Sequence, residues 1–249
     1  MQVTVAKTAG FCFGVRRALE LTQKSAARTP TCTLGELIHN RQVVEELAGQ
    51  GVAVIEHPED APAGAAVVIR SHGVGPQVYD TLRAQGSPVI DATCPFVKRI
   101  HQIAAEVPEN GLLLLAGRRE HPEVQGILGY CLGQALVFSS AEEMQELLAF
   151  LPSDGNIPVI LAAQTTFSLR EWEKILFFAK KVCTNLKVFD TICRATIERQ
   201  SEAKQLAQSA DAIVVVGGLH SANTTALAAL CGSYCPTVQV ETADQLERH

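Results

Sequence analysis

Three of the eight cysteines open similar stretches of sequence at positions far apart in the chain. Cys12 begins CFGVRR, Cys94 begins CPFVKR, and Cys193 begins CRATIER, with one extra residue before the arginine. Each stretch reads as the start of a helix that carries basic residues. The unpaired N–H groups and positive end of a helix stabilise a thiolate, and neighbouring cations add to this effect. Thiolates placed in this way are ready to bind soft metals.

Three such thiolates that meet at one point form a site for a metal cluster. Zinc usually takes four ligands, often in close C-x-x-C pairs, whereas this chain has only the looser pair Cys231 and Cys235. Iron–sulfur clusters are commonly held by four cysteines. If only three cysteines bind a [4Fe–4S] cluster, one iron has no protein ligand. That iron is a Lewis acid within a redox-active cluster, which favours an enzyme over an electron carrier. The remaining cysteines read as core residues, at positions 32, 131, 183, 231 and 235.

Three histidines stand where strands give way to turns or helices: His39 in ELIHN, His72 in IRSHGVG and His121 in REHPEVQG. Ligands collect at the carboxyl ends of parallel strands, and a charged histidine donates from both ring nitrogens. Together the three predict a cradle for an anion such as phosphate, although each one alone reads more readily as a scaffold residue. In GGLHSANT, Ser221 and Asn223 can cap a helix or donate to a phosphate at its N-terminus.

A carboxyl and a hydroxyl join this set. Glu123 lies two residues after His121, and a carboxyl in a dry pocket has a raised pKa and can relay protons. A solvated glutamate at a helix start is the plainer interpretation, and spacing alone favours it. Thr165 follows the apolar run VILAA and brings a hydroxyl to the same strand end, where helix capping would also account for it.

The elements that must position these side chains alternate in type along the chain. Runs such as VVI, LLLL and IVVV lack polar alternation, which is typical of parallel strands covered by helices on both faces. We expect strands at 2–6, 31–34, 52–55, 65–69, 88–90, 111–115, 135–138, 157–162, 186–189, 212–216 and 237–240. We expect helices near 14–27, 41–50, 76–85, 96–106, 122–130, 141–150, 168–182, 195–209 and 222–231. The predicted fold class is α/β, with three small parallel-sheet units in a pseudo-threefold ring that presents the three cysteines at its centre.

Composition narrows the class of protein. The 249 residues are 47% hydrophobic and 19% charged, which is enough for a substantial core. A net charge of −5 argues against a nucleic-acid partner. The N-terminus has no signal-peptide pattern, and the longest apolar runs are far short of the ~20 residues that a membrane helix needs. We therefore expect a cytoplasmic protein without a membrane partner, in which the cysteines are not paired in disulfides.

Eight motifs in order closely resemble the LytB-type 4-hydroxy-3-methylbut-2-enyl diphosphate reductases, from residue 9 to about 243: AGFCFGVRRA, ELIHN, SHGV, DATCPFV, EHPEVQG, QTT, TICRAT and SANT. The resemblance implies a trefoil of units 13–93, 94–189 and 190–249, the last joined by the N-terminal strand 1–12. It implies a central [4Fe–4S] cluster on Cys12, Cys94 and Cys193, with one open iron. It also implies that the diphosphate is held by His39, His72, His121, Ser221 and Asn223.

The same resemblance assigns proton delivery to Glu123 and orientation of the substrate to Thr165. The substrate's hydroxyl would leave as water with two electrons, giving isopentenyl and dimethylallyl diphosphates in the last step of the non-mevalonate pathway. Ferredoxin or flavodoxin would supply the electrons. Both are acidic, so a basic surface could steer docking, drawn from the set Arg16, Arg17, Lys98, Arg99, Arg118 and Arg119. For most of these residues a solvated helix face is the plainer interpretation.

Two departures from the family pattern leave alternatives open. Ala222 stands where the family usually has serine, and the family usually continues past VETADQL with a strand, a phosphate loop and a helix. We therefore expect an incomplete third unit and a weaker anion site. An iron–sulfur hydro-lyase without net electron flow, and a degenerate cluster-bearing sensor or binding protein, remain alternative functions.

Overall fold

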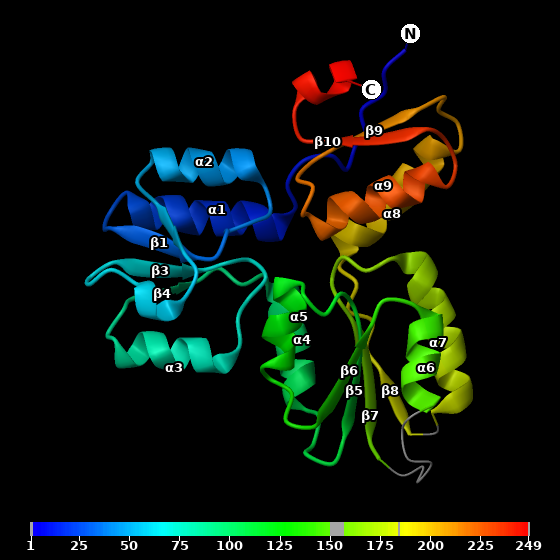
Figure 1. Cartoon of the computed structure of the whole chain (residues 1–249), viewed down its shortest axis with the longest axis horizontal. Coiled ribbons are helices and arrows are strands. Elements are labelled where there is room, and N and C mark those ends of the chain that lie inside the picture. Colours follow the sequence, from blue (N-terminus) through cyan, green and yellow to red (C-terminus); the bar gives the residue numbers. More distant parts are fainter. Residues whose placement is uncertain (1, 150–156, 184, 249) are drawn as a thin grey trace.

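The computed structural model describes residues 2–149, 157–183 and 185–248, and over these residues three parallel sheets lie around a common centre (Figure 1). The α/β fold class predicted from the sequence is confirmed. Each sheet falls within one of the predicted units, 13–93, 94–189 and 190–249; the unit boundaries themselves stay a prediction. Residue 1 of the predicted N-terminal strand 1–12, residue 150 of the predicted helix 141–150 and residue 249 of the predicted third unit lie outside the described residues.

The first sheet has the strand order β2-β1-β3-β4. Its strands are β1 (Thr31–Leu34), β2 (Ala53–Ile55), β3 (Ala66–Ile69) and β4 (Val89–Asp91). Its helices are α1 (Phe13–Ala26), α2 (Arg41–Gly49), the 3-10 turn η1 (Pro58–Asp60) and α3 (Pro76–Ala84). Val68 packs with α1 and α2 on one face, whereas Val67 and Ile69 pack with α3 on the other.

The second sheet repeats this plan with the order β6-β5-β7-β8. Its strands are β5 (Leu112–Ala116), β6 (Gln134–Phe138), β7 (Val159–Ala163) and β8 (Leu186–Val188). Its helices are α4 (Pro95–Ala105), α5 (Pro122–Leu128), α6 (Ala141–Ala149) and α7 (Leu169–Val182). Leu112 and Leu114 face α6 and α7, while Leu113 and Leu115 face α4 and α5, so the unbroken apolar run is buried on both sides as predicted.

The third sheet pairs only β9 (Ile213–Val216) with β10 (Thr237–Val240) over the described residues. The helices α8 (Arg194–Ala207) and α9 (Ala222–Gly232) pack against each other, and the 3-10 helix η2 (Ala243–Arg248) follows β10. Val214 and Val216 of β9 are 46% and 69% exposed. One face of this apolar strand is therefore exposed, whereas its sequence predicts that helices cover both faces.

The predicted strand at 2–6 is wrong, because these residues form no strand and Val3 and Val5 are about three-quarters exposed. An alternating pattern makes a strand only where a sheet edge pairs with it and buries its apolar side. The residues that follow this segment are instead tied to α8, whose Glu202 carboxylate accepts hydrogen bonds from the backbone N–H groups of Lys7 at 2.7 Å and Thr8 at 2.8 Å. The N-terminal stretch thus contacts the third unit at residues 7 and 8, and not through its sheet.

The other cysteines and the helices bear on two further expectations. Of the cysteines read as core residues, Cys32 and Cys231 are buried, whereas Cys131, Cys183 and Cys235 are only half-buried. None of the helices in the described parts of the chain combines the length and the apolar character that crossing a membrane requires.

Candidate metal and anion site

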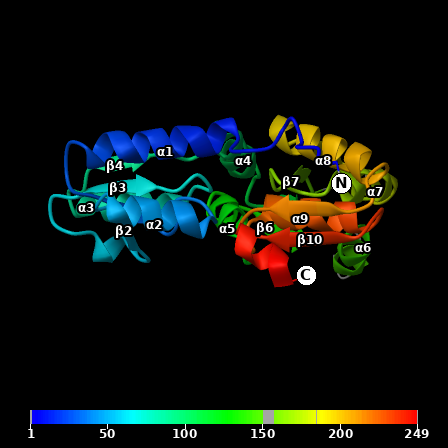
Figure 2. The same ribbon diagram turned by 90° about the horizontal axis from the view of Figure 1, so that it is seen from above.

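Six helices begin near the centre of the molecule, where the three units meet. Figure 2 shows α1, α4 and α8 along one face of the molecule and α2, α5 and α9 along the other. The first three have Cys12, Cys94 and Cys193 as their N-cap residues. The second three begin after Asn40 (next to His39), His121 and Ser221. The repeated strand–helix plan therefore places thiols toward one face and imidazoles and hydroxyls toward the other.

The sulfurs of Cys12 and Cys94 lie close together, and Cys193 lies within electrostatic range of Cys94. A Cβ placed on Gly14 would lie 2.7 Å from Sγ of Cys94 and 3.9 Å from Sγ of Cys12, so the distance between these sulfurs cannot exceed the sum of the two lengths. Cys193 is close enough for its charge to raise the pKa of Cys94. All three are half-buried and free of disulfides. Glycine at position 14 keeps the space between two of the sulfurs open.

The electrostatics of Cys94 differ from the sequence argument. Burial raises the pKa of the Cys94 thiol, and the charges of Cys12 and Cys193 raise it further. The N–H groups of Phe96 and Val97, at the helix start, lower the pKa as predicted but do not outweigh burial. A metal cation supplies the positive charge that such crowded thiolates need. Three half-buried soft sulfurs fit an iron–sulfur cluster.

The three histidines form a tight triad. Their ring centroids lie 4.7 Å apart for His39 and His72, 5.8 Å for His39 and His121, and 5.3 Å for His72 and His121. Burial lowers the pKa of His39, lowers that of His72 well below its ordinary value, and lowers that of His121 to about 3. At neutral pH the triad is therefore uncharged until a ligand enters.

Hydrogen bonds decide which ligand suits the triad. The ring nitrogens are within 4.8 Å of one another, close enough for a single metal ion. However, Nδ1 of His121 accepts a hydrogen bond from the N–H of Glu123 at 3.1 Å. A neutral imidazole with this acceptor carries its proton on Nε2, where it can donate to an anion, whereas a metal ligand must present a bare nitrogen. The geometry favours an anion.

Arg70 is a functional candidate that the sequence analysis missed. It directly follows β3, and its guanidinium lies against Gly35, whose φ of +70° is left-handed. Nε of Arg70 is buried without a hydrogen-bond partner among the described residues. The charge of Arg70 lowers the pKa of each histidine in the triad. Its position at the carboxyl end of a strand, in IRSHG, was the signal that could have revealed this fixed positive charge.

Glu123 and Thr165 form a buried pair. Glu123 is only 2% exposed, so the solvated interpretation is wrong. Oε1 accepts from the N–H of Thr165 and Oε2 from its hydroxyl, each at 2.7 Å. Burial raises the pKa of Glu123 to about 7, although both hydrogen bonds lower it. This carboxyl can therefore both hold and release a proton near neutral pH.

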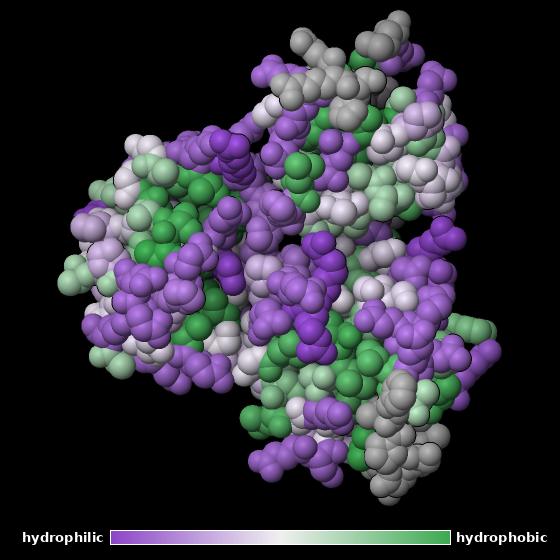
Figure 3. Space-filling model, viewed as in Figure 1, coloured by the Kyte–Doolittle hydropathy of each residue, from purple (hydrophilic) through white to green (hydrophobic). Residues whose placement is uncertain are grey.

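Two backbone hydrogen bonds connect these groups to the cysteines. The N–H of Cys193 donates to the carbonyl of Thr165 at 3.0 Å, and the N–H of Cys94 donates to the carbonyl of Ser71, next to His72, also at 3.0 Å. The proton-holding pair, the triad and the thiols therefore lie around one centre. The space-filling view shows the surface hollowed there, between the three lobes, with hydrophilic residues at its rim (Figure 3).

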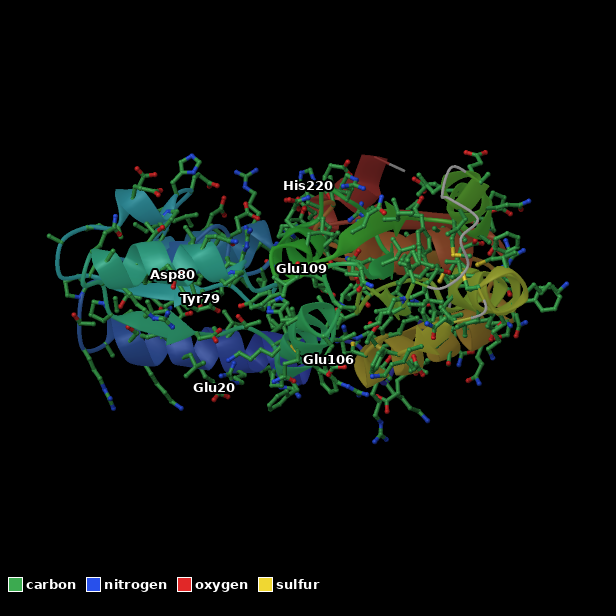
Figure 4. All side chains as sticks on the ribbon, turned by 90° about the horizontal axis from the view of Figure 1, so that it is seen from below. Glu20, Tyr79, Asp80, Glu106, Glu109 and His220 are labelled. Carbon is green, nitrogen blue, oxygen red and sulfur yellow. The ribbon has the colours of Figure 1, made fainter. Side chains whose placement is uncertain are left out.

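The last two predicted residues lie at the start of α9. Oγ of Ser221 accepts from the N–H of Thr224 at 3.4 Å, so its capping role is present, and Asn223 is half-buried in the first turn. The preceding loop contacts the triad, since a Cβ on Gly218 would strike the carbonyl of His39. His220, labelled in Figure 4, lowers the pKa of His39. Among the described residues, neither Ser221 nor Asn223 has a hydrogen bond to the triad.

This chain is similar to known proteins over almost its whole length. The family model described as LytB protein matches residues 3–249. The 4-hydroxy-3-methylbut-2-enyl diphosphate reductase of Caldanaerobacter subterraneus subsp. tengcongensis is 39% identical to this chain over 253 residues, which cover 99% of this chain and 86% of that protein. The protein of the same name from Desulfovibrio desulfuricans is 41% identical over 257 residues, covering 99% and 88%.

Solved structures agree with this match. A structure of (E)-4-hydroxy-3-methyl-but-2-enyl diphosphate reductase, the terminal enzyme of the non-mevalonate pathway, is 36% identical with a TM-score of 0.70, covering 98% of this chain and 87% of that one. The E-1-hydroxy-2-methyl-but-2-enyl-4-diphosphate reductase from Plasmodium falciparum is 25% identical with a TM-score of 0.86, covering 96% and 77%. The chain therefore belongs to the LytB protein family.

Proposed function

We propose that this protein is a 4-hydroxy-3-methylbut-2-enyl diphosphate reductase, the terminal enzyme of the non-mevalonate pathway. Two electrons and two protons replace the substrate's hydroxyl by hydrogen and release it as water, giving isopentenyl and dimethylallyl diphosphates. Family membership supports this assignment. The observation that carries it is the buried Glu123–Thr165 pair, which is bonded through Thr165 to a cysteine and through Glu123 to the histidine triad.

The cofactor proposal rests on the three thiols. The family is iron–sulfur dependent. We assign Cys12, Cys94 and Cys193 as ligands of a [4Fe–4S] cluster, which when bound supplies electrons and a Lewis-acidic iron to the site. We assign its electron donor as ferredoxin or flavodoxin.

The chain's own residues bind the diphosphate and hold a proton. Nε2 of His121 donates to a phosphate oxygen, and the fixed charge of Arg70 attracts the anion. Ser221 and Asn223 add donors at the N-terminus of α9, where N–H groups and the helix dipole favour an anion. Anchoring this end orients the hydroxyl toward the thiols, where Glu123 in its protonated form can donate the proton that lets the hydroxyl leave as water, a better leaving group than hydroxide.

Arg70→Met is expected to weaken binding of inorganic diphosphate to the holoprotein by about tenfold or more, because charge-assisted hydrogen bonds are strong. Removing this cation also favours protonation of the triad histidines, but burial still holds their pKa below the ordinary value, so this gain does not replace the lost charge at neutral pH. The other neighbouring titratable groups, Glu36, Glu56, Arg118 and His220, are unchanged. Calorimetric titration at neutral pH measures the change in affinity. Arg83→Met, an exposed arginine paired with Asp80, is the control; equal affinities for both variants would refute the assignment.

The function itself is tested with anaerobically reconstituted protein. We expect about four irons per chain and oxidation of a reduced viologen that depends on the allylic diphosphate. Mössbauer spectra with and without substrate count the irons and show whether one of them changes coordination. Turnover without a reductant would indicate a hydro-lyase, and a well-loaded cluster that binds diphosphate without turnover would indicate a sensor.

A further inference from the structure

Three phenylalanines are exposed beside the cysteines. Phe11 is 41% exposed, Phe13 57% and Phe96 45%. Phe11 and Phe13 flank Cys12, and Phe96 follows Cys94 by two residues. The close approach of Gly14 to the sulfur of Cys94 brings the starts of α1 and α4 together. Exposed apolar side chains gathered at one place on a polar surface mark an interaction site.

Basic residues lie beside this group, and the first turns of α1, α4 and α8 contain no acidic residue. Lys98 is paired with Asp91 at 2.6 Å and Arg194 with Glu198 at 2.7 Å. Arg16 and Arg99 are exposed and have no ion pair among the described residues. In a chain of net charge −5, this end of the three helices is a local positive site.

We propose that Phe11, Phe13, Phe96, Arg16 and Arg99, here called the cysteine-side patch, dock a flavodoxin-type carrier, a small acidic protein that exposes the apolar edge of its flavin. The inference rests on the proposed reductase function. Acidic groups around the flavin complement Arg16 and Arg99, and its apolar edge matches the phenylalanine rings. Contact at Phe13 or Phe96 leaves the donor one or two residues from a cysteine, which keeps the electron path short.

The number of electrons in the reaction determines how many times the carrier docks at the patch. Each encounter oxidises the reduced flavin by one electron, and two encounters supply the two electrons that one dehydroxylation consumes. The protons come from the site and solvent, not from the carrier. Of the basic residues predicted to steer docking, Arg118 and Arg119 lie in the loop before α5, which lies with α2 and α9 on the other face (Figure 2), and they are not part of the patch.

The double variant Phe13→Ser, Phe96→Ser tests the apolar part of the patch in the holoenzyme. With reduced flavodoxin, kcat/KM for the carrier is expected to fall at least about tenfold, as for interface anchors. With dithionite-reduced methyl viologen, which needs no docking, turnover is expected to stay within about twofold, so the reductase activity is measured independently. Phe177→Ser is the matched control, since Phe177 is 66% exposed on α7. Equal losses with both donors, or no loss with flavodoxin, would overturn the proposal.

Charge reversal tests the basic residues of the cysteine-side patch. Arg99→Glu is expected to slow the reaction with flavodoxin and to flatten its dependence on salt, because steering between opposite charges is screened by ions. Arg28→Glu makes the same change in net charge on an exposed residue beyond the far end of α1. If both variants slow the carrier equally, only the net charge matters and the patch is not the docking site.

Discussion

Glu123→Gln is expected to lower kcat by about a hundredfold or more, the usual contribution of a general acid, while the visible absorption of the cluster stays unchanged. Glutamine keeps an oxygen that can accept from the N–H of Thr165, which the carboxylate does at 2.7 Å. It cannot hold a transferable proton. Loss of turnover with an intact cluster would therefore separate proton delivery from metal binding.

The pH dependence gives this prediction a second readout. Burial raises the pKa of Glu123 to about 7, so the carboxyl loses its proton as the pH rises through neutrality. We expect kcat to fall above this pH in the native enzyme. Stability has the same direction, because the unfolded carboxyl ionises near its ordinary value of 4.5 while the folded one still holds its proton. The free energy of unfolding therefore decreases from about pH 4.5 to 7 through this group, and Glu123→Gln removes that decrease.

The control for Glu123 lies three residues away. Glu120 is exposed, so Glu120→Gln makes the same chemical change outside the buried site. It should leave kcat, its pH profile and the stability slope unchanged. If Glu123→Gln turned over at the native rate, Glu123 would have no part in proton delivery, and the raised pKa would reflect burial alone.

The sequence predicted the fold well where a local pattern determined the environment. The run Leu112–Ala116 has apolar residues at every position, and only a strand between two helix layers buries all of them. The segment 2–6 shows the limit of this argument. Its alternation is compatible with a strand, but strand formation depends on an edge that local sequence does not specify, and Val3 and Val5 remain exposed.

The candidate site likewise combines features that the local sequence predicts with features that it does not. The similar residues that follow the three cysteines predicted that these cysteines lie near one another, because a repeated structural unit presents equivalent positions to one centre. Glu123 and Thr165 are 42 residues apart, and no spacing rule joins them. Burial of that carboxyl, against the solvated interpretation, arises from packing between α5 and the end of β7. Arg70 was missed because a lone arginine after a strand is ordinary until the neutral triad beside it is seen.

Gly14→Ala is expected to affect stability and metal loading in opposite directions. Alanine stabilises the interior of a helix by roughly 0.5–1 kcal/mol relative to glycine. Gly14 is the second residue of α1, so the metal-free protein should gain less than this, with a small rise in Tm when the Cys94 side chain turns aside. The new Cβ would lie 2.7 Å from the sulfur of Cys94, closer than such contacts occur, so that sulfur must move. A thiolate fixed by metal coordination cannot move freely, and we therefore expect reconstituted protein to hold less than about half of the four irons of a full cluster.

Iron and acid-labile sulfide per chain, measured beside the Tm of the metal-free protein, test both directions. Gly49→Ala is the matched control, because Gly49 is also helical and a Cβ there meets nothing within 4 Å. It should keep the native iron content. Full loading of Gly14→Ala with an unchanged spectrum would mean that the sulfurs of Cys12 and Cys94 do not grip one cluster across this glycine, and the ligand assignment from which the proposed reaction follows would fail with it.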